Sequence, residues 1–140
     1  MNKDNYSIEW FNKAKTDLAT AQFLLDMKPI PIDVICYHCE QTIEKALKGL
    51  LVKNNIDPPK THDLVELCKS CCEFNDGLES FMNAFIELTP YAVNVRYPSE
   101  EELDVQDMNF ALEEATKIID YVTPLFDLEE DESQEWDLSL

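Results

Sequence analysis

Glycine is scarce in this chain, and long apolar stretches are missing. Only two glycines occur among 140 residues, whereas a sheet protein with many tight turns needs more of them. No apolar run approaches the roughly 20 residues that a membrane-spanning helix requires. The first residues, MNKDNYSIEW, contain no apolar segment of the kind found in secretory signal peptides. The composition favours an all-helical protein, which we expect to be cytoplasmic and not membrane-bound.

Basic residues are also few. Eleven lysines and arginines stand against 29 aspartates and glutamates, which gives a formal net charge of −18. We do not expect direct binding to DNA or RNA, because phosphate backbones are held by clustered cations. The one basic stretch covers residues 45–60, which contain four lysines and a single acid, Asp57. If the protein binds a small anion, the electrostatic potential is least unfavourable there.

Apolar residues recur at intervals of three and four, which places them on one face of a helix. This spacing predicts helices at residues 5–27, 33–55, 62–73, 78–89 and 103–126. Short connections between such helices are typical of an antiparallel up-and-down bundle of four to five helices. We therefore predict an all-α fold over residues 1–126. Residues 127–140 include seven carboxylates and no base, so we expect an acidic, mobile tail.

The ends of these helices carry residues with known terminal preferences. Asp33 is expected to cap the second helix, and Thr61 or Asp63 the third. Two adjacent prolines at residues 58–59 cannot continue a helix, so they separate the two. Gly77 is expected to adopt a left-handed backbone conformation after the third helix.

The second predicted helix has two distinct stripes. Its apolar seam is formed by Cys39, Ile43, Ala46 and Leu50. On the opposite side of the helical wheel lie His38, Gln41, Lys45 and Lys48. These polar side chains could hold phosphate oxygens or the carboxylates of a partner. Alternatively, they form a solvated face with pairs within the helix, such as Glu44 with Lys48 and Gln41 with Lys45.

Two cysteine pairs have a spacing that zinc sites also use. They are Cys36 with Cys39, and Cys68 with Cys71. Both pairs fall on the apolar seams of predicted helices, where a reduced cysteine acts as a small hydrophobic residue. We therefore expect neither a metal nor a redox disulfide.

Three segments resemble the HEPN domain family. They are Gln41 with the EKALK run at 44–48, the PPKTHDLVEL run at 58–67, and the Arg96–Tyr97–Pro98 triplet. Their order and spacing are similar to those of the family over residues 8–126. The resemblance implies an all-α bundle that forms homodimers. It also implies that the chain pairs with a minimal nucleotidyltransferase in a toxin–antitoxin-like module.

Many HEPN proteins are metal-independent ribonucleases that use an arginine followed, four to six residues later, by a histidine. The one arginine here is Arg96, and His38 and His62 both precede it. The ribonuclease signature is absent, so we carry no catalytic residue over to this chain. Arg96 lies between Tyr91 and Tyr97, a setting that suits a planar anion or a stacked base. A structural ion pair with the glutamates at 100–102 is the alternative.

We therefore expect a non-catalytic subunit that binds a nucleotide or another phosphate-bearing ligand and has no cofactor. The candidate ligand-binding residues are His38, Gln41, Lys45, Lys48, Tyr91, Arg96 and Tyr97. One alternative is a ribonuclease or toxin with a rearranged site that uses His38 or His62. Another is a structural dimerisation or docking module whose acidic tail recruits a basic partner.

Overall fold

The computed structural model describes residues 3–93 and 102–126, and within them every regular element is a helix. The helices are α1 (Lys3–Phe23), α2 (Ile32–Lys53), α3 (Leu64–Cys72), α4 (Met82–Leu88) and α5 (Val105–Phe126). Short 3₁₀ segments adjoin them: η1 (Leu24–Asp26), η2 (Asp76–Phe81) and η3 (Thr89–Ala92). The predicted all-α bundle is confirmed. None of the described helices is long and apolar enough to cross a membrane.

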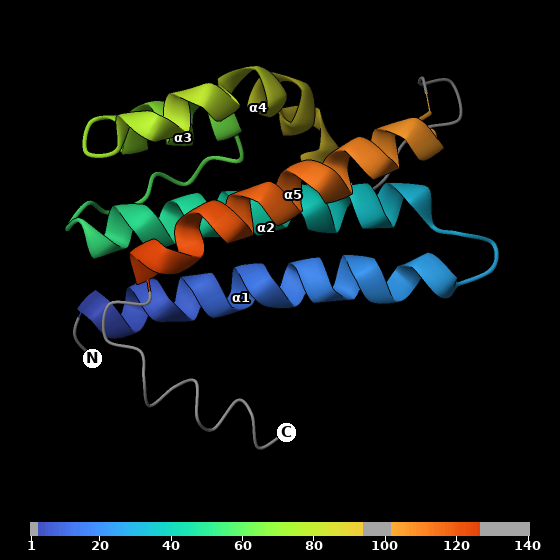
Figure 1. Ribbon diagram of the computed structural model, residues 1–140, viewed down its shortest axis with the longest axis horizontal. Helices are drawn as coiled ribbons and strands as arrows, with labels where there is room; N and C mark the ends of the chain where they lie inside the picture. Colours follow the sequence, from blue (N-terminus) through green and yellow to red (C-terminus); the bar gives the residue numbers. More distant parts are fainter. Residues whose placement is uncertain (1–2, 94–101, 127–140) are drawn as a thin grey trace.

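Helix α2 is the centre of the bundle. It packs against α1, α5, α3 and η3. In Figure 1, α1 and α2 lie side by side in opposite directions, and α5 runs along both. The short α3 packs on α2 on the side away from α1, and α4 packs on α3. The predicted seam on α2 is confirmed, because Cys39, Ile43 and Ala46 are fully buried and Leu50 is 2% exposed.

The structure corrects one predicted helix cap, confirms another and divides one predicted helix. The α2 N-cap is Pro31, and Asp33 lies inside the first turn, where its charge still favours the helix dipole. Asp63 does cap α3, because its side chain accepts hydrogen bonds from the backbone N–H groups of Val65 and Glu66. The segment predicted as one helix at 78–89 is instead divided among η2, α4 and η3.

The left-handed residue of the described chain is Asn55, with φ of 66°, and Gly77 has no positive φ. Asparagine tolerates this conformation, and here it ends α2. Gly77 is needed for a different reason, since a Cβ there would meet the hydroxyl of Tyr121. That hydroxyl donates a hydrogen bond of 2.7 Å to Asn75, so α5 is fixed to the turn before η2.

Candidate ligand-binding site beside helix α2

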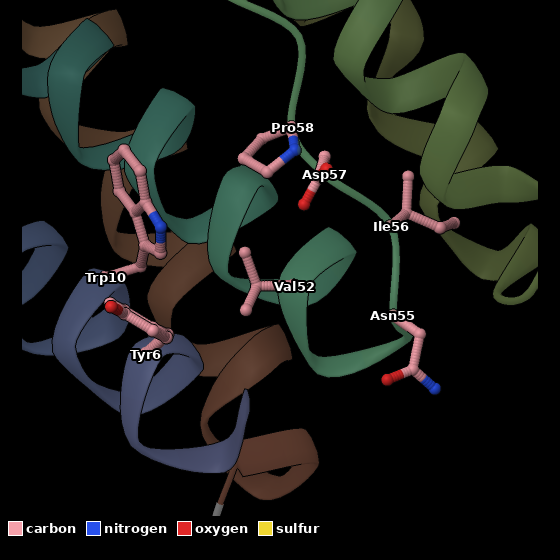
Figure 2. Close-up of a pocket in the computed structure, with 7 residues that line it drawn as sticks. All are labelled: Tyr6, Trp10, Val52, Asn55, Ile56, Asp57 and Pro58. Atoms are coloured by element: carbon pink, nitrogen blue, oxygen red, sulfur yellow. The ribbon is translucent and has the colours of Figure 1, made fainter. Parts of the chain in front are cut away.

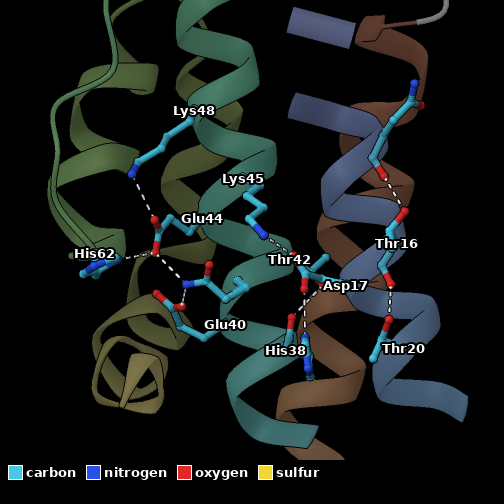
Figure 3. Close-up of polar contacts among 12 residues, drawn as sticks. Thr16, Asp17, Thr20, His38, Glu40, Thr42, Glu44, Lys45, Lys48 and His62 are labelled. Carbon is cyan, nitrogen blue, oxygen red and sulfur yellow. Dashed lines mark hydrogen bonds and ion pairs between the residues drawn. The ribbon is translucent and has the colours of Figure 1, made fainter. Parts of the chain in front are cut away.

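A buried carboxylate on α2 organises the first part of the candidate site. The side chain of Glu44 is 4% exposed and contacts three polar neighbours (Figure 3). It accepts hydrogen bonds from Lys48 Nζ at 2.9 Å and from Gln41 Nε2 at 3.0 Å. Its Oε1 also lies 2.9 Å from Nδ1 of His62, which follows the turn after α2. Glu44 therefore ties the loop before α3 to the centre of the bundle.

His62 is the exposed member of this group. Its side chain is 71% exposed. Because the Glu44 carboxylate can only accept, Nδ1 carries the hydrogen of that contact, which leaves Nε2 available to a ligand. Nε2 can accept a hydrogen bond from a ligand when the ring is neutral, and it can donate one to an anion when both ring nitrogens carry hydrogen. Sequence reasoning omitted His62 from the site, although it lies in the PPKTHDLVEL run.

Glu40 lies one turn before Glu44 and is completely buried. Its Oε1 accepts a hydrogen bond of 2.8 Å from Gln41, while its Oε2 has no partner. Burial, and after it the nearby charge of Glu44, raise the pKa of the Glu40 carboxyl to about 9. Glu40 is thus neutral at physiological pH, and the cluster contains a single carboxylate charge opposite Lys48.

A second carboxylate, Asp17 on α1, gathers the other half of the predicted stripe. Its Oδ1 lies 2.8 Å from Nδ1 of His38, and its Oδ2 accepts a hydrogen bond of 2.6 Å from Lys45 Nζ. These contacts fasten α1 to α2. The sequence predicted a single open polar face on α2. The structure does not have one. The polar stripe is divided between Asp17 and Glu44, and Gln41 and Lys48 are both buried.

The predicted pairs within α2 are half right. Lys48 does pair with Glu44, but Gln41 bonds Glu40 and Glu44 instead of Lys45. The physical reason is that α2 is enclosed by neighbouring helices, so its polar side chains must find partners inside the protein.

The aromatic and arginine candidates were predicted from the segment after α4. Tyr91 is 5% exposed and belongs to the hydrophobic core. Its burial raises the pKa of its phenol, as does the charge of Asp107. Tyr91 is therefore a core residue in this structure. Arg96 and Tyr97 lie outside the described residues, so their place in a site stays a prediction.

An open pocket of about 460 Å³ lies between the start of α1 and the end of α2. The residues that line it are Tyr6, Trp10, Val52, Asn55, Ile56, Asp57 and Pro58 (Figure 2). A smaller hollow of about 250 Å³ shares Tyr6 and Trp10 and adds Glu9 and Lys13. No sequence pattern predicts this pocket, because its wall combines two segments more than 40 residues apart.

The pocket and the Glu44 cluster lie along one face of α2. Glu44, Lys48 and Val52 are each four residues apart, so they are stacked on the same side of the helix. Lys48 joins the two parts directly, since its Nζ lies 5.8 Å from the centre of the Trp10 ring. Eight residues of helix separate Glu44 from Val52 by about 12 Å. A flat ring can thus bind at one end, with an anionic group at the other.

All five cysteines lie in the described part of the chain, and none forms a disulfide. Cys36, Cys39, Cys68 and Cys71 are buried on the helix seams, as predicted. Burial raises the pKa of the Cys68 and Cys71 thiols to about 12, so neither is a reactive thiolate at neutral pH. Among the described residues, no group of three or more histidine, cysteine or acidic side chains is arranged to hold a metal.

Comparison with known proteins gives one match. The family model of the HEPN domain matches residues 8–130, which is most of the chain. No curated protein and no protein of known structure matches this chain. The match agrees with the helical bundle and with the three sequence segments that resemble the family. The chain belongs to the HEPN domain family.

Proposed function

We propose that this HEPN domain is a non-catalytic subunit that binds a nucleotide beside α2. The observation that supports the proposal is the shared face of α2, where an aromatic pocket adjoins the Lys48–Glu44–His62 cluster. A base would stack on Trp10 and Tyr6, as bases commonly do on aromatic side chains. The phosphates would meet the exposed ring of His62, and the buried Lys48 ammonium would contribute its positive charge from the other oxygen of the same Glu44 carboxylate.

Binding of an anion is compatible with the large negative charge. The cluster holds one carboxylate charge, since Glu40 is neutral, and Lys48 balances it. With hydrogen on both ring nitrogens, His62 would add a positive charge to the cluster and could donate its Nε2–H to a phosphate oxygen. Glu44 already holds the His62 imidazole in place, so that side chain loses little conformational entropy when the ligand binds.

Calorimetric titration with ATP and GTP tests this proposal. We expect His62→Ala to weaken nucleotide affinity about tenfold or more, because a hydrogen bond to a charged group is lost. Lys117→Ala, which removes an exposed lysine on α5, is the matched control and should leave affinity unchanged. Arg96→Ala belongs in the same series, since equal affinity there would remove Arg96 from the site. Wild-type protein that binds neither nucleotide contradicts the proposal.

We further propose, from the family resemblance, that the domain is a cytoplasmic homodimer that pairs with a minimal nucleotidyltransferase in a toxin–antitoxin-like module. The neighbouring reading frame should then encode such an enzyme. Co-expression of the two chains should yield one complex on size-exclusion chromatography, with a mass that reports the dimer. Elution of the two chains as separate species would contradict the pairing.

A further inference from the structure

We infer that the pocket beside Trp10 selects guanine, so that the site prefers guanine nucleotides to adenine nucleotides. This inference rests on the proposed nucleotide-binding function and adds the identity of the base. The pocket supplies two features that a base-specific site needs: rings on which any base can stack, and a polar group placed at the rim that distinguishes one base edge from another.

The stacking surface comes from α1 and the end of α2. Tyr6 and Trp10 are one helical turn apart on α1, so their side chains lie on the same face. In Figure 2 the two side chains lie together on one side of the pocket, and Val52 and Pro58 come from the other. The exposed half of the Tyr6 side chain is available to a ligand. These groups accept a flat, apolar surface and do not by themselves choose among bases.

The rim carries a carboxylate at a fixed position. Asp57 is exposed and lines the pocket. The chain around it has little freedom, because Ile56 N–H donates to the Leu51 carbonyl at 2.9 Å and Asn55 holds the left-handed turn. Pro58 fixes the next backbone angle. The carboxylate is therefore presented to the pocket by a stiff segment and not by a loop that must be ordered on binding.

A carboxylate accepts hydrogen bonds and cannot donate them. The edge of guanine carries two neighbouring donors, its N1–H and its exocyclic amine. The two oxygens of one carboxylate can accept both hydrogen bonds at the same time. Adenine presents an acceptor at N1, which would face the negative oxygens. An arginine from a partner protein offers a similar two-donor edge. The Lys48–His62 end of the same face favours the nucleotide, because Glu44 is already paired with Lys48 and leaves no unpaired carboxylate for a guanidinium.

Tryptophan fluorescence can report ligand binding in this pocket directly. The chain has two tryptophans, so Trp136→Phe leaves Trp10 as the single reporter. In that background we expect GTP to quench the fluorescence of Trp10. We also expect GTP to bind at least about tenfold more tightly than ATP, which is the effect of about one hydrogen bond to a charged group. Asp57→Asn should weaken GTP binding about tenfold and leave ATP binding nearly unchanged. Asp120→Asn, an exposed carboxylate on α5, is the matched control and should behave as the parent.

The outcomes separate the two proposals. Equal or tighter binding of ATP, or a GTP preference that survives Asp57→Asn, overturns the guanine assignment and leaves nucleotide binding in place. If neither nucleotide binds, both proposals fail. Quenching by free arginine at lower concentration than by GTP also overturns the assignment, in favour of a basic protein partner. Because Asp57 is exposed, its substitution should not disturb folding, which circular dichroism will verify.

Discussion

Replacement of Glu44 by leucine is expected to lower the free energy of unfolding by about 3–5 kcal/mol. The reason is the burial of its partner, since the Lys48 side chain is only 10% exposed and cannot turn to water without leaving its place on α2. Glu44→Leu would also remove the acceptor for Gln41 and the anchor of His62. The ammonium would then stay buried without its partner, and the Gln41 amide would keep only its bond to Glu40, so the loss exceeds what the original pair contributed.

The double variant Glu44→Leu/Lys48→Met should recover much of this loss. It replaces both charges with apolar groups of similar size, so no uncompensated charge is left in the interior. Glu114→Leu provides a matched control, because Glu114 is similarly buried while its partner Lys117 is 56% exposed and can return to solvent. The expected cost of breaking that pair is about 1 kcal/mol or less.

Urea denaturation at neutral pH, followed by circular dichroism, measures all four free energies. A loss near 1 kcal/mol for Glu44→Leu, equal to that of Glu114→Leu, would contradict the assignment of Glu44 as a buried organising charge. A double variant as unstable as Glu44→Leu alone would also contradict it. In that case the contacts with Gln41 and His62, and not the Lys48 pair, would account for the stability.

The helices and their buried faces were predictable because the 3–4 spacing encodes them directly. Ile43 and Leu50 on α2, like Phe85 and Leu88 on α4, are buried where that spacing places them. The spacing defines which residues share a face of one helix. The spacing does not predict how many other helices will pack around that helix.

This limit explains why the polar side of α2 is not the single open face that was predicted. On a helical wheel Gln41 and Lys48 belong to a polar side, yet both are buried because α1, α3 and α5 all pack on α2. The Glu44–Lys48 pair could be predicted, since both residues lie on one helix at a favourable interval. Asp17 and His62 could not be paired with α2 in advance, because those contacts depend on how the helices and a loop meet in three dimensions.

The pocket was missed for the same reason. Trp10 follows the apolar pattern of α1, and the pattern alone suggests a core residue. The structure leaves part of its ring open because the chain turns sharply at Asn55 and Pro58 and does not cover it. A proline pair after an asparagine turn was visible in the sequence, but its position opposite the start of α1 was not.

Substitution of Glu40 by glutamine is expected to make the protein more stable at pH 8 and to leave it almost unchanged near pH 5. In the folded chain, burial raises the pKa of Glu40 from 4.5 to about 9. Between these values the unfolded chain releases the proton, while the folded chain keeps it. The folded state therefore binds more protons, and the stability of the wild-type protein falls as the pH rises through this range.

The size of the effect follows from the same linkage. One proton held only by the folded state changes the free energy of unfolding by about 1.4 kcal/mol per pH unit. Glutamine has nearly the same shape, does not ionise, and retains an oxygen that can accept the hydrogen bond from Gln41. Glu40→Gln should thus remove most of this slope. The gap between variant and wild type should widen steadily from pH 5 to pH 8.

Urea titrations at unit pH steps test this expectation, and the quantity of interest is the difference between variant and wild type at each pH. All other ionisable groups are the same in the two proteins, so their contributions cancel in the difference. Glu113→Gln, an exposed glutamate on α5, is the matched control and should give a flat difference. A flat difference for Glu40→Gln would mean that the Glu40 carboxyl ionises in the folded protein. The cluster would then carry a second negative charge, and its capacity to accept phosphate beside His62 would be lost.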